Sequence, residues 1–201
     1  MLLDLLGARY EINEVPYGDR SALATLTGGY IYVPVLEDAD GTVVVESRDI
    51  CERLLGRDAA RRFCPDALAG PIWAYADFCD GPLEDLLFRV ASPDVRDKWR
   101  DPGERALYTL VKERKFGAGC VDAWLRDRTA LLGRARKLVA PTLVTLAERP
   151  FLFGEQPTLA DAALYGLLAM LHEANPSLVT DLAPALEPYR LRVEAAARAP
   201  R

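Results

Sequence analysis

The stretch from Val33 to Leu55 constrains the fold most, because a hairpin and a helix can be predicted from its residues alone. Val35–Leu36 and Val43–Val45 are short runs of β-branched or aliphatic residues, which are typical of strands. The intervening Asp38–Gly41 contains the Asp-Gly pair that marks a hairpin turn. The stretch therefore predicts two antiparallel strands joined by a short turn.

A helix is predicted directly after the second strand. The side-chain oxygen of Ser47 can accept a hydrogen bond from an exposed amide of the first turn, and Ile50 and Leu54 recur at the spacing of one buried face. Considered alone, such a serine is more often an ordinary N-cap than a ligand-binding residue. Pro34 cannot donate a ladder hydrogen bond, so we expect it at a sheet edge or in a special turn.

This stretch resembles the second half of the thioredoxin-like domain of glutathione S-transferases, through Val33–Leu36, the hairpin and Glu46–Ser47. The resemblance implies that Pro34 is cis and that the backbone of Val33 pairs with the cysteinyl part of glutathione. It also implies that Glu46 and Ser47 bind the γ-glutamyl amine and carboxylate. A helix N-terminus offers unpaired amides and a positive dipole end, which is an independent reason to expect a carboxylate there.

A second motif lies over a hundred positions further on, where Phe151–Asp161 resembles the family's signature for its central C-terminal helix. Independently of the resemblance, Thr158 and Asp161 have the spacing of a capping box. The residues that follow are apolar almost all round the helix, which predicts a position inside a bundle. We therefore assign Thr158 and Asp161 a structural role.

The two motifs and the helical pattern between them predict a glutathione transferase fold. Its thioredoxin-like α/β domain is placed over residues 1–58 and its all-α helical bundle domain over residues 65–201. The resemblance also implies a homodimer.

Several further elements are expected from local patterns. Met1–Gly7 has the pattern of the last turns of a helix closed by a glycine, and Tyr10–Val15 alternates as a strand. A helix is predicted from Ala69 to Val90, with a kink at Pro82. A loop at Ser92–Asp94 and one long helix from Val121 to Leu146 follow.

Compared with the family pattern, Met1 falls inside the first helix of the thioredoxin-like domain. The first strand, and the turn that carries the catalytic Tyr, Ser or Cys, then have no counterpart, so the domain is expected to be incomplete and its catalytic residue is unknown. That strand is interior in the family's sheet, and each buried backbone group left unpaired costs about 1–3 kcal/mol. We therefore expect a misplaced start or a truncated fragment rather than a natural domain without its centre.

Composition excludes several other functions. The chain has 201 residues, 50% of them hydrophobic, and a net charge of −5, which suits a globular chain without an overall basic footprint for nucleic acid or an anionic membrane. No apolar run reaches the roughly 18 residues of a membrane span, and no secretory signal is evident. Four widely spaced cysteines and one histidine disfavour a metal site and favour reduced thiols in the cytoplasm.

Three other features have both a functional and a structural interpretation. Trp73, Tyr75 and Phe78 are candidates for lining the substrate cleft, although an aromatic stripe on a helix is usually core. The basic run Lys112–Lys115 lacks the order of a P-loop, and cations before a terminal glycine complement the helix dipole, which is the favoured interpretation. Cys120 would be a nucleophile only in a setting that lowers its pKa.

Two function classes remain open. The resemblance implies an enzyme that uses glutathione as a co-substrate, either to conjugate a small electrophile or to transfer thiols and disulfides. The alternative is a non-catalytic member of the fold that serves as a binding or dimerisation module. The sequence does not identify the second substrate.

Overall fold

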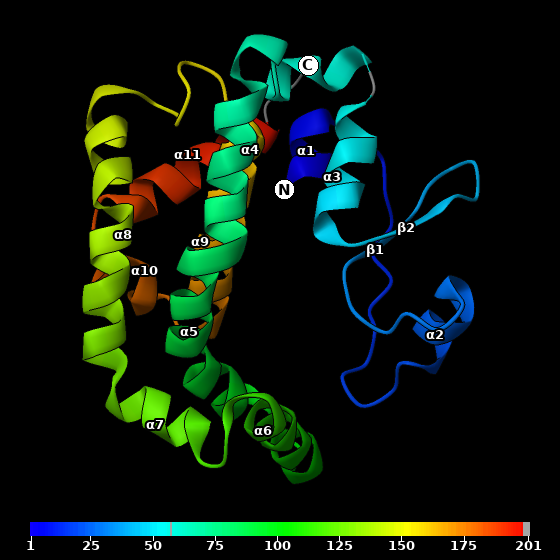
Figure 1. Ribbon diagram of the computed structural model, residues 1–201, viewed down its shortest axis with the longest axis vertical. Coiled ribbons are helices and arrows are strands. Elements are labelled where there is room, and N and C mark those ends of the chain that lie inside the picture. The colour runs from blue at the N-terminus through cyan, green and yellow to red at the C-terminus, as the bar shows by residue number, and fades with distance from the viewer. Residues whose placement is uncertain (57, 199–201) are drawn as a thin grey trace.

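A computed structural model describes residues 1–56 and 58–198 of the chain. A small α/β region is followed by a larger helical region, as predicted (Figure 1). The expected domain boundary lies at residues 58–65, next to Arg57, and the expected second domain ends at residue 201. Arg57 and residues 199–201 lie outside the described residues. No helix in the described ranges is long and apolar enough to cross a membrane.

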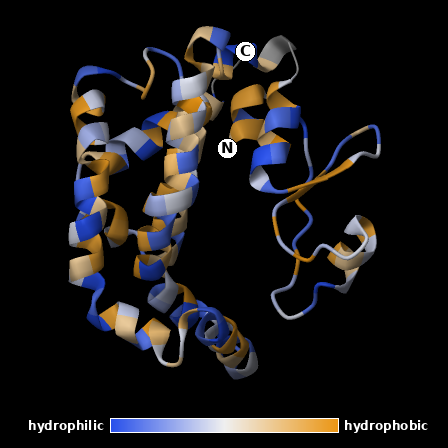
Figure 2. Cartoon of the chain, in the orientation of Figure 1, coloured by the Kyte–Doolittle hydropathy of each residue, from blue (hydrophilic) through white to orange (hydrophobic). Residues whose placement is uncertain are grey.

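The α/β region contains three helices and two strands within residues 1–56. They are α1 (Leu2–Leu6), α2 (Ser21–Thr27), β1 (Val35–Glu37), β2 (Val43–Val45) and α3 (Ser47–Leu55). The strands pair antiparallel, with Val35 opposite Val45, and both are hydrophobic in Figure 2. Helix α1 ends at Gly7, which adopts a left-handed φ of 65°. The predicted hairpin and the predicted helix end are confirmed.

The hairpin turn is held by α3. The Asp38 amide donates to the Thr42 carbonyl at 2.9 Å, and Gly41 adopts the positive φ of 80° that this turn requires. The guanidinium of Arg53 donates to Asp38 at 2.9 Å and to Asp40 at 2.7 Å. The turn is thereby fixed relative to the helix that follows it.

The predicted strand over Tyr10–Val15 is wrong. These residues form an extended segment without a ladder, in which Ile12 is 77% exposed. Alternation predicts a strand only where a neighbouring strand supplies hydrogen bonds and a core face. Here the Tyr10 hydroxyl instead donates to Asp4 at 2.6 Å, which ties the segment back to α1.

The helical region contains two 3₁₀ helices, one π-helical turn and eight α-helices within the described residues. In chain order they are η1 (Asp58–Phe63), η2 (Asp66–Leu68), α4 (Ala69–Phe78), the π-turn η3 (Cys79–Leu83), α5 (Glu84–Lys98), α6 (Pro102–Phe116), α7 (Cys120–Arg126), α8 (Arg128–Glu148), α9 (Leu159–Ala174), α10 (Ser177–Leu182) and α11 (Leu186–Arg198).

Helix α9 lies at the centre of this region. Helices α4, α5, α10 and α11 all pack against it, and α5 also packs on α7 and α8 (Figure 1). The side chains that α9 buries are mostly aliphatic: Leu159, Ala160, Ala162, Leu164, Leu167, Leu168, Leu171 and Ala174. Helix α1 packs against α11, so the α/β region shares this core through Leu2 and Leu5.

Two predicted helix boundaries are wrong. The expected loop at Ser92–Asp94 lies inside α5, because the packing of this segment in the core holds Pro93 within the helix. The expected single helix from Val121 to Leu146 is divided at Asp127, whose backbone (φ −91°, ψ 5°) both ends α7 and starts α8. An ion pair between Arg128 and Asp94 ties the start of α8 to α5. At Pro82, where the sequence predicts a kink, the structure has the π-turn η3 between α4 and α5.

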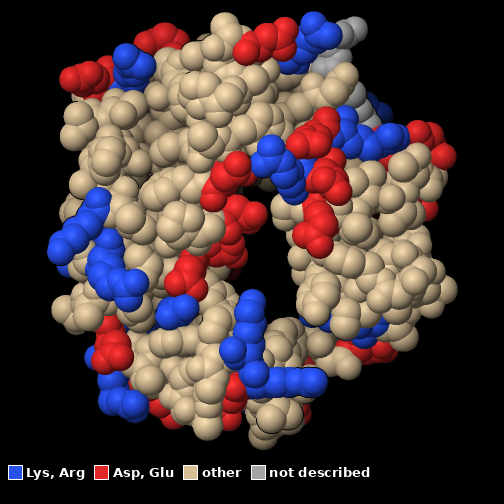
Figure 3. All heavy atoms as spheres, in the orientation of Figure 1, with Lys and Arg blue, Asp and Glu red and all other residues tan. Residues whose placement is uncertain are grey.

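The two regions also meet at a second place, far from α1. The ring of Tyr17, in the loop before α2, lies 5.5 Å from the ring of Trp99 and 5.7 Å from that of Tyr108 on α6. Between the two contacts the molecule is hollowed by an opening that passes between the regions (Figure 3). The walls of this opening are therefore formed by both parts of the chain.

Candidate functional site

The start of α3 has an unusual backbone. Glu46 occupies the N-cap position with a positive φ of 67°, and its carbonyl accepts from the Ile50 amide at 3.0 Å. A positive φ in a residue other than glycine is strained and is often found at a functional site. The prediction that Ser47 caps α3 is therefore wrong, because β2 turns into the helix at Glu46 and Ser47 is already helical.

The displacement of Ser47 leaves its hydroxyl available. This residue is exposed, and its side chain makes no hydrogen bond to the part of the chain that the structure describes. The first amides of α3 likewise lack a side-chain cap. The helix start therefore presents a hydroxyl and unpaired N–H donors to solvent, which together suit a carboxylate.

Glu46 is oriented by an aromatic side chain. The Tyr30 hydroxyl donates to Glu46 Oε1 at 2.9 Å, and the ring of Tyr32 stands edge-on to that of Tyr30 at 5.5 Å. Burial, followed by the hydrogen bond to Glu46, raises the pKa of Tyr30, so its hydroxyl remains protonated and donating at neutral pH. The second carboxylate oxygen of Glu46 stays open to a cationic ligand group.

Val33 lies just before β1, at the end of the sheet. The Val33–Pro34 peptide is cis, as the resemblance implied. Val33 is 54% exposed, and within residues 1–56 and 58–198 its amide and carbonyl have no hydrogen-bond partner. An extended peptide can pair with such groups.

Arg48 is a residue of the site that the sequence did not single out. Its guanidinium donates to Asp77 on α4 at 2.6 Å and to Glu52 at 3.1 Å, and it lies 4.5 Å from the ring centroid of Trp73. Helix α3 is thereby connected to α4 directly beside Ser47. No local pattern signals this role, because the partners lie 25 and 29 positions away in the sequence.

A pocket of about 420 Å³ lies where α1, α3, α4 and α9 meet. Ser47 and Arg48 line it from the α/β region, and Trp73, Asp80 and Glu84 line it from the helical region. Of the three aromatic residues proposed for the cleft, the structure brings Trp73 to this pocket.

Tyr75 and Phe78 do not line that pocket. The Tyr75 hydroxyl shares a 2.7 Å hydrogen bond with Thr142 on α8, and its ring lies 5.5 Å from that of Phe78. Burial raises the pKa of Tyr75, which keeps the hydroxyl neutral. The Tyr75 hydroxyl joins α4 to α8, so the structure brings neither Tyr75 nor Phe78 to the pocket beside Ser47.

The four cysteines are free thiols, and burial raises the pKa of each of them. The pKa is raised to about 11 for Cys51 and to about 12 for Cys79, with the charge of Asp80 as the second cause in both. Cys120 is the first residue of α7, but burial and Glu113 outweigh the effect of the helix start. A thiol with a raised pKa is a poor nucleophile at neutral pH.

Thr158 and Asp161 lie in the core at the start of α9 and do not themselves line the pocket beside Ser47. They form a capping box, in which Asp161 Oδ2 accepts from the Thr158 amide at 2.8 Å and from its hydroxyl at 2.9 Å. The other carboxylate oxygen accepts from the Leu152 amide at 2.9 Å and from the Tyr189 hydroxyl at 2.8 Å. One buried carboxylate therefore joins three segments of the helical region.

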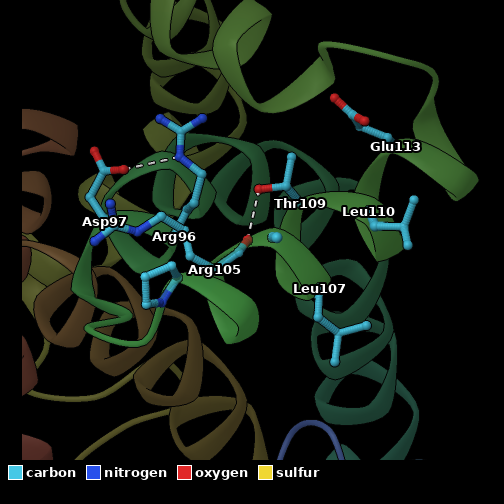
Figure 4. A pocket seen from close by; sticks show the side chains of 9 residues that line it. Arg96, Asp97, Arg105, Leu107, Thr109, Leu110 and Glu113 are labelled. Carbon is cyan, nitrogen blue, oxygen red and sulfur yellow. Dashed lines mark hydrogen bonds and ion pairs between the residues drawn. The ribbon is translucent and has the colours of Figure 1, made fainter.

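A separate hollow of about 940 Å³ lies on α6 and the end of α5 (Figure 4). Its polar groups already have partners: Arg96 donates to Asp97 at 3.0 Å, and the Thr109 hydroxyl donates to the Arg105 carbonyl at 3.0 Å. It contains none of the residues proposed to bind glutathione. Among the described residues, no group of three or more His, Cys, Asp or Glu side chains could hold a metal ion.

Comparison with protein families gives two matches. Residues 1–62 match the N-terminal domain of glutathione S-transferases, and residues 122–197 match the C-terminal domain. A search of curated proteins found no match.

Solved structures with the same fold cover nearly the whole chain. Glutathione transferase GSTFuA3 from Phanerochaete chrysosporium is 16% identical with a TM-score of 0.73, and the match covers 100% of this chain and 88% of that one. GSTFuA2 from the same organism is 18% identical with a TM-score of 0.72 over 99% and 88%. A glutathione S-transferase from Pseudomonas fluorescens is 24% identical with a TM-score of 0.63 over 99% and 89%. At these identities the likeness shows a shared fold.

Proposed function

The chain belongs to the glutathione S-transferase family, and from this membership we propose that it binds glutathione through Val33, Pro34, Glu46 and Ser47 and uses it as a co-substrate. The observation that carries the proposal is the start of α3. There a strained glutamate and an unpartnered serine hydroxyl stand next to free helix amides.

The γ-glutamyl end of glutathione carries an amine and a carboxylate on the same carbon. The Ser47 hydroxyl and the first amides of α3 suit the carboxylate, and the dipole of the helix adds to the attraction. Glu46 suits the amine, since Tyr30 occupies only one of its two oxygens. The opposite charges of the ligand thus match two adjacent residues.

The middle of the tripeptide is assigned to the end of the sheet. The free amide and carbonyl of Val33 can form two hydrogen bonds with the cysteinyl residue, in the manner of an added strand. Pro34 stands between this residue and the first paired residue of β1. The ligand would then run from α3 along the edge of the sheet.

We propose conjugation as the reaction. The glutathione thiolate attacks an electrophilic carbon, a C–S bond forms, and the leaving group departs with its bonding electrons while the thiol proton goes to solvent. In thiol–disulfide transfer, the same thiolate would attack a disulfide sulfur and release a second thiolate. Either reaction needs a group that stabilises the glutathione thiolate, or a protein cysteine that acts as the nucleophile in its place. The raised pKa values of the four cysteines speak against the second possibility.

The second candidate function is a non-catalytic binding or dimerisation module of the same fold. The four thiols with raised pKa values favour it, because none of them is prepared for nucleophilic attack. An assay of conjugation with a chlorodinitrobenzene-type electrophile distinguishes the two. Turnover above the uncatalysed rate supports the enzyme, and glutathione binding without turnover supports the module.

We also propose that the protein is a cytoplasmic homodimer. Leu110 and Val111 on α6 are 62% and 44% exposed, and a second copy could cover such apolar side chains. Sedimentation equilibrium measures the assembly directly. A mass of one chain across micromolar concentrations would contradict the dimer.

Calorimetric titration with glutathione tests the binding site. The double variant Glu46→Ala with Ser47→Ala should lose about tenfold or more in affinity, because a charge-assisted hydrogen bond contributes about 1.5–3 kcal/mol. The matched control, Glu148→Ala with Ser177→Ala on α8 and α10, should bind as the wild type does. Equal affinities in both double variants would remove Glu46 and Ser47 from the site.

A further inference from the structure

Two lysines on α6 have aromatic neighbours and no ion pair with a described residue. Lys112 Nζ lies 4.6 Å from the ring centroid of Phe88 and 4.9 Å from that of Tyr108, and Lys115 Nζ lies 5.2 Å from that of Phe116. Neither ammonium forms an ion pair with a described residue, although the chain as a whole is acidic. Neither ammonium is therefore held in a direct ion pair within the described part of the protein.

The aromatic residues beneath these cations form one cluster. The rings of Phe88, Phe116 and Trp124 lie 5.2 to 5.9 Å from one another. The guanidinium of Arg89 adds a third cation, 5.7 Å from the Phe116 ring centroid, and this one is paired with Asp85 at 2.7 Å. The surface thus combines apolar ring area with two unpaired positive charges.

The two lysines lie along the wall of the opening between the two regions. Lys115 is close enough to Glu84, which lines the pocket beside Ser47, to act on its charge. Lys112 covers Tyr108, whose ring contacts Tyr17 of the α/β region. Figure 3 shows acidic atoms along one side of the opening and basic atoms at its lower edge.

We propose that Lys112 and Lys115, with the half-buried rings of Phe88 and Phe116, bind an aromatic carboxylate or sulfonate that serves as the second substrate. We call these four residues the lysine wall. The inference rests on the proposed function, since it names the class of substrate that would meet glutathione in the opening. The aromatic part of the ligand would lie against the rings, and its anion would accept hydrogen bonds from the ammonium groups.

Three physical arguments support the lysine wall. An ammonium above an aromatic face keeps N–H donors free for an oxyanion. Burial, followed by the charge of Lys115, lowers the pKa of Lys112. An anion bound between the two ammonium groups would offset both the loss of solvation and the repulsion between them. Asp80 and Glu84 further along the wall would repel an anion and thus orient it toward the lysines.

The helix dipole explains only part of this basic run. Helix α6 ends at Phe116, so Arg114 and Lys115 lie in its last turn and complement the dipole, as the sequence suggested. Lys112 lies a turn earlier and is half-buried against Phe88 on α5. A lysine in that position is not needed to end the helix.

Two matched probes test the proposal without glutathione: 3,5-dinitrobenzoate, which is anionic, and 3,5-dinitrobenzamide, which is neutral and of similar shape. Their binding is measured by quenching of tryptophan fluorescence, since Trp124 lies in the aromatic cluster. Wild-type protein should bind the benzoate about fivefold or more tightly than the benzamide, because two close cations act on its charge. Lys112→Met with Lys115→Met should bind both probes equally.

Controls separate charge from folding. Lys137→Met, an exposed lysine on α8, should keep the wild-type preference, and so should Lys112→Arg with Lys115→Arg, which conserves the charge. Thermal unfolding by circular dichroism establishes that each variant is folded. Wild-type protein without a preference for the benzoate, or a preference that survives Lys112→Met with Lys115→Met, would overturn the proposal.

Glutathione also carries a glycyl carboxylate, which has the same chemistry as the proposed anion. Calorimetry with glutathione distinguishes the two, because the Lys112→Met, Lys115→Met variant should bind it with wild-type affinity. A tenfold loss there would assign the lysines to glutathione and overturn the proposal. Wild-type protein that does not bind glutathione at all would refute the proposed function, whereas the probe preference would still report on the lysine wall.

Discussion

At the scale of single residues, burial determines what the polar groups can do. Glu46 and Ser47 are exposed, keep free hydrogen-bonding groups and are proposed to bind ligand. Asp161 is buried and Tyr75 is half-buried, and both form hydrogen bonds with buried residues. The cysteines follow the same rule. Their burial raises the pKa of each thiol and makes the thiolate rare at neutral pH.

The thiol pKa values predict slow alkylation. With a pKa of about 11 for Cys51 and about 12 for Cys79, both thiols should react with iodoacetamide at pH 7.5 at least about a hundredfold more slowly than a free cysteine of pKa about 8.5. The rate should rise as the pH rises toward 11, because the thiolate is the reactive form. Mass spectrometry of digested, time-quenched samples measures each site separately. Rapid modification of Cys51 at pH 7.5 would contradict the raised pKa and make this thiol a candidate nucleophile.

At the scale of elements, the helical region is fixed by the start of α9. Asp161 accepts hydrogen bonds from Leu152, from both the amide and the hydroxyl of Thr158, and from Tyr189 on α11. Its side chain is fully buried, so all of these bonds lie in the core. Loss of the carboxylate would leave several buried hydrogen-bond donors without an acceptor at once.

This arrangement predicts a graded series of stabilities in urea. Tyr189→Phe removes one donor and should cost about 0.5–1.5 kcal/mol, and Thr158→Ala should cost about 0.5–2 kcal/mol. Asp161→Ala leaves unpaired donors in the core and should cost about 3 kcal/mol or more. The exposed variant Glu155→Ala on the same loop serves as the control, with a midpoint close to wild type. A midpoint for Asp161→Ala equal to that of Tyr189→Phe would contradict the central role of the carboxylate.

Elements whose signals are local were predictable from the sequence. The Asp-Gly hairpin, the glycine that ends α1 and the start of α9 all depend on side chains within a few positions of each other. The prediction of a strand over Tyr10–Val15 failed because a strand requires a neighbouring strand, which no local pattern reveals. The division at Asp127 and the passage of α5 through Pro93 also depend on contacts with distant helices.

The candidate site was likewise only partly predictable from the sequence. Val33, Glu46 and Ser47 could be proposed from the sequence because the resemblance covers a continuous stretch. Arg48 was missed because Asp77 and Trp73, which it contacts, come from α4. The sequence did not predict the contact between Tyr75 and Thr142, because Thr142 lies on the distant helix α8. The backbone of Glu46 gave no sequence signal, since glutamate seldom adopts a positive φ.

At the scale of the whole molecule, the two regions enclose a common opening and supply different chemistry to it. The α/β region presents the start of α3 and the end of the sheet, which suit a zwitterionic peptide. The helical region presents aromatic rings and the unpaired ammonium groups of Lys112 and Lys115. The Arg48–Asp77 ion pair and the Tyr17 contacts hold the two regions in this relation.

The central claim is that α3 recognises the γ-glutamyl end of glutathione, and a paired calorimetric titration tests it most directly. Glutathione and cysteinylglycine, which lacks only the γ-glutamyl group, are titrated into the wild type and into Glu46→Ala with Ser47→Ala. We predict that the wild type binds glutathione about tenfold or more tightly than cysteinylglycine, and that the double variant binds the two equally. Equal binding of both peptides by the wild type would contradict the account.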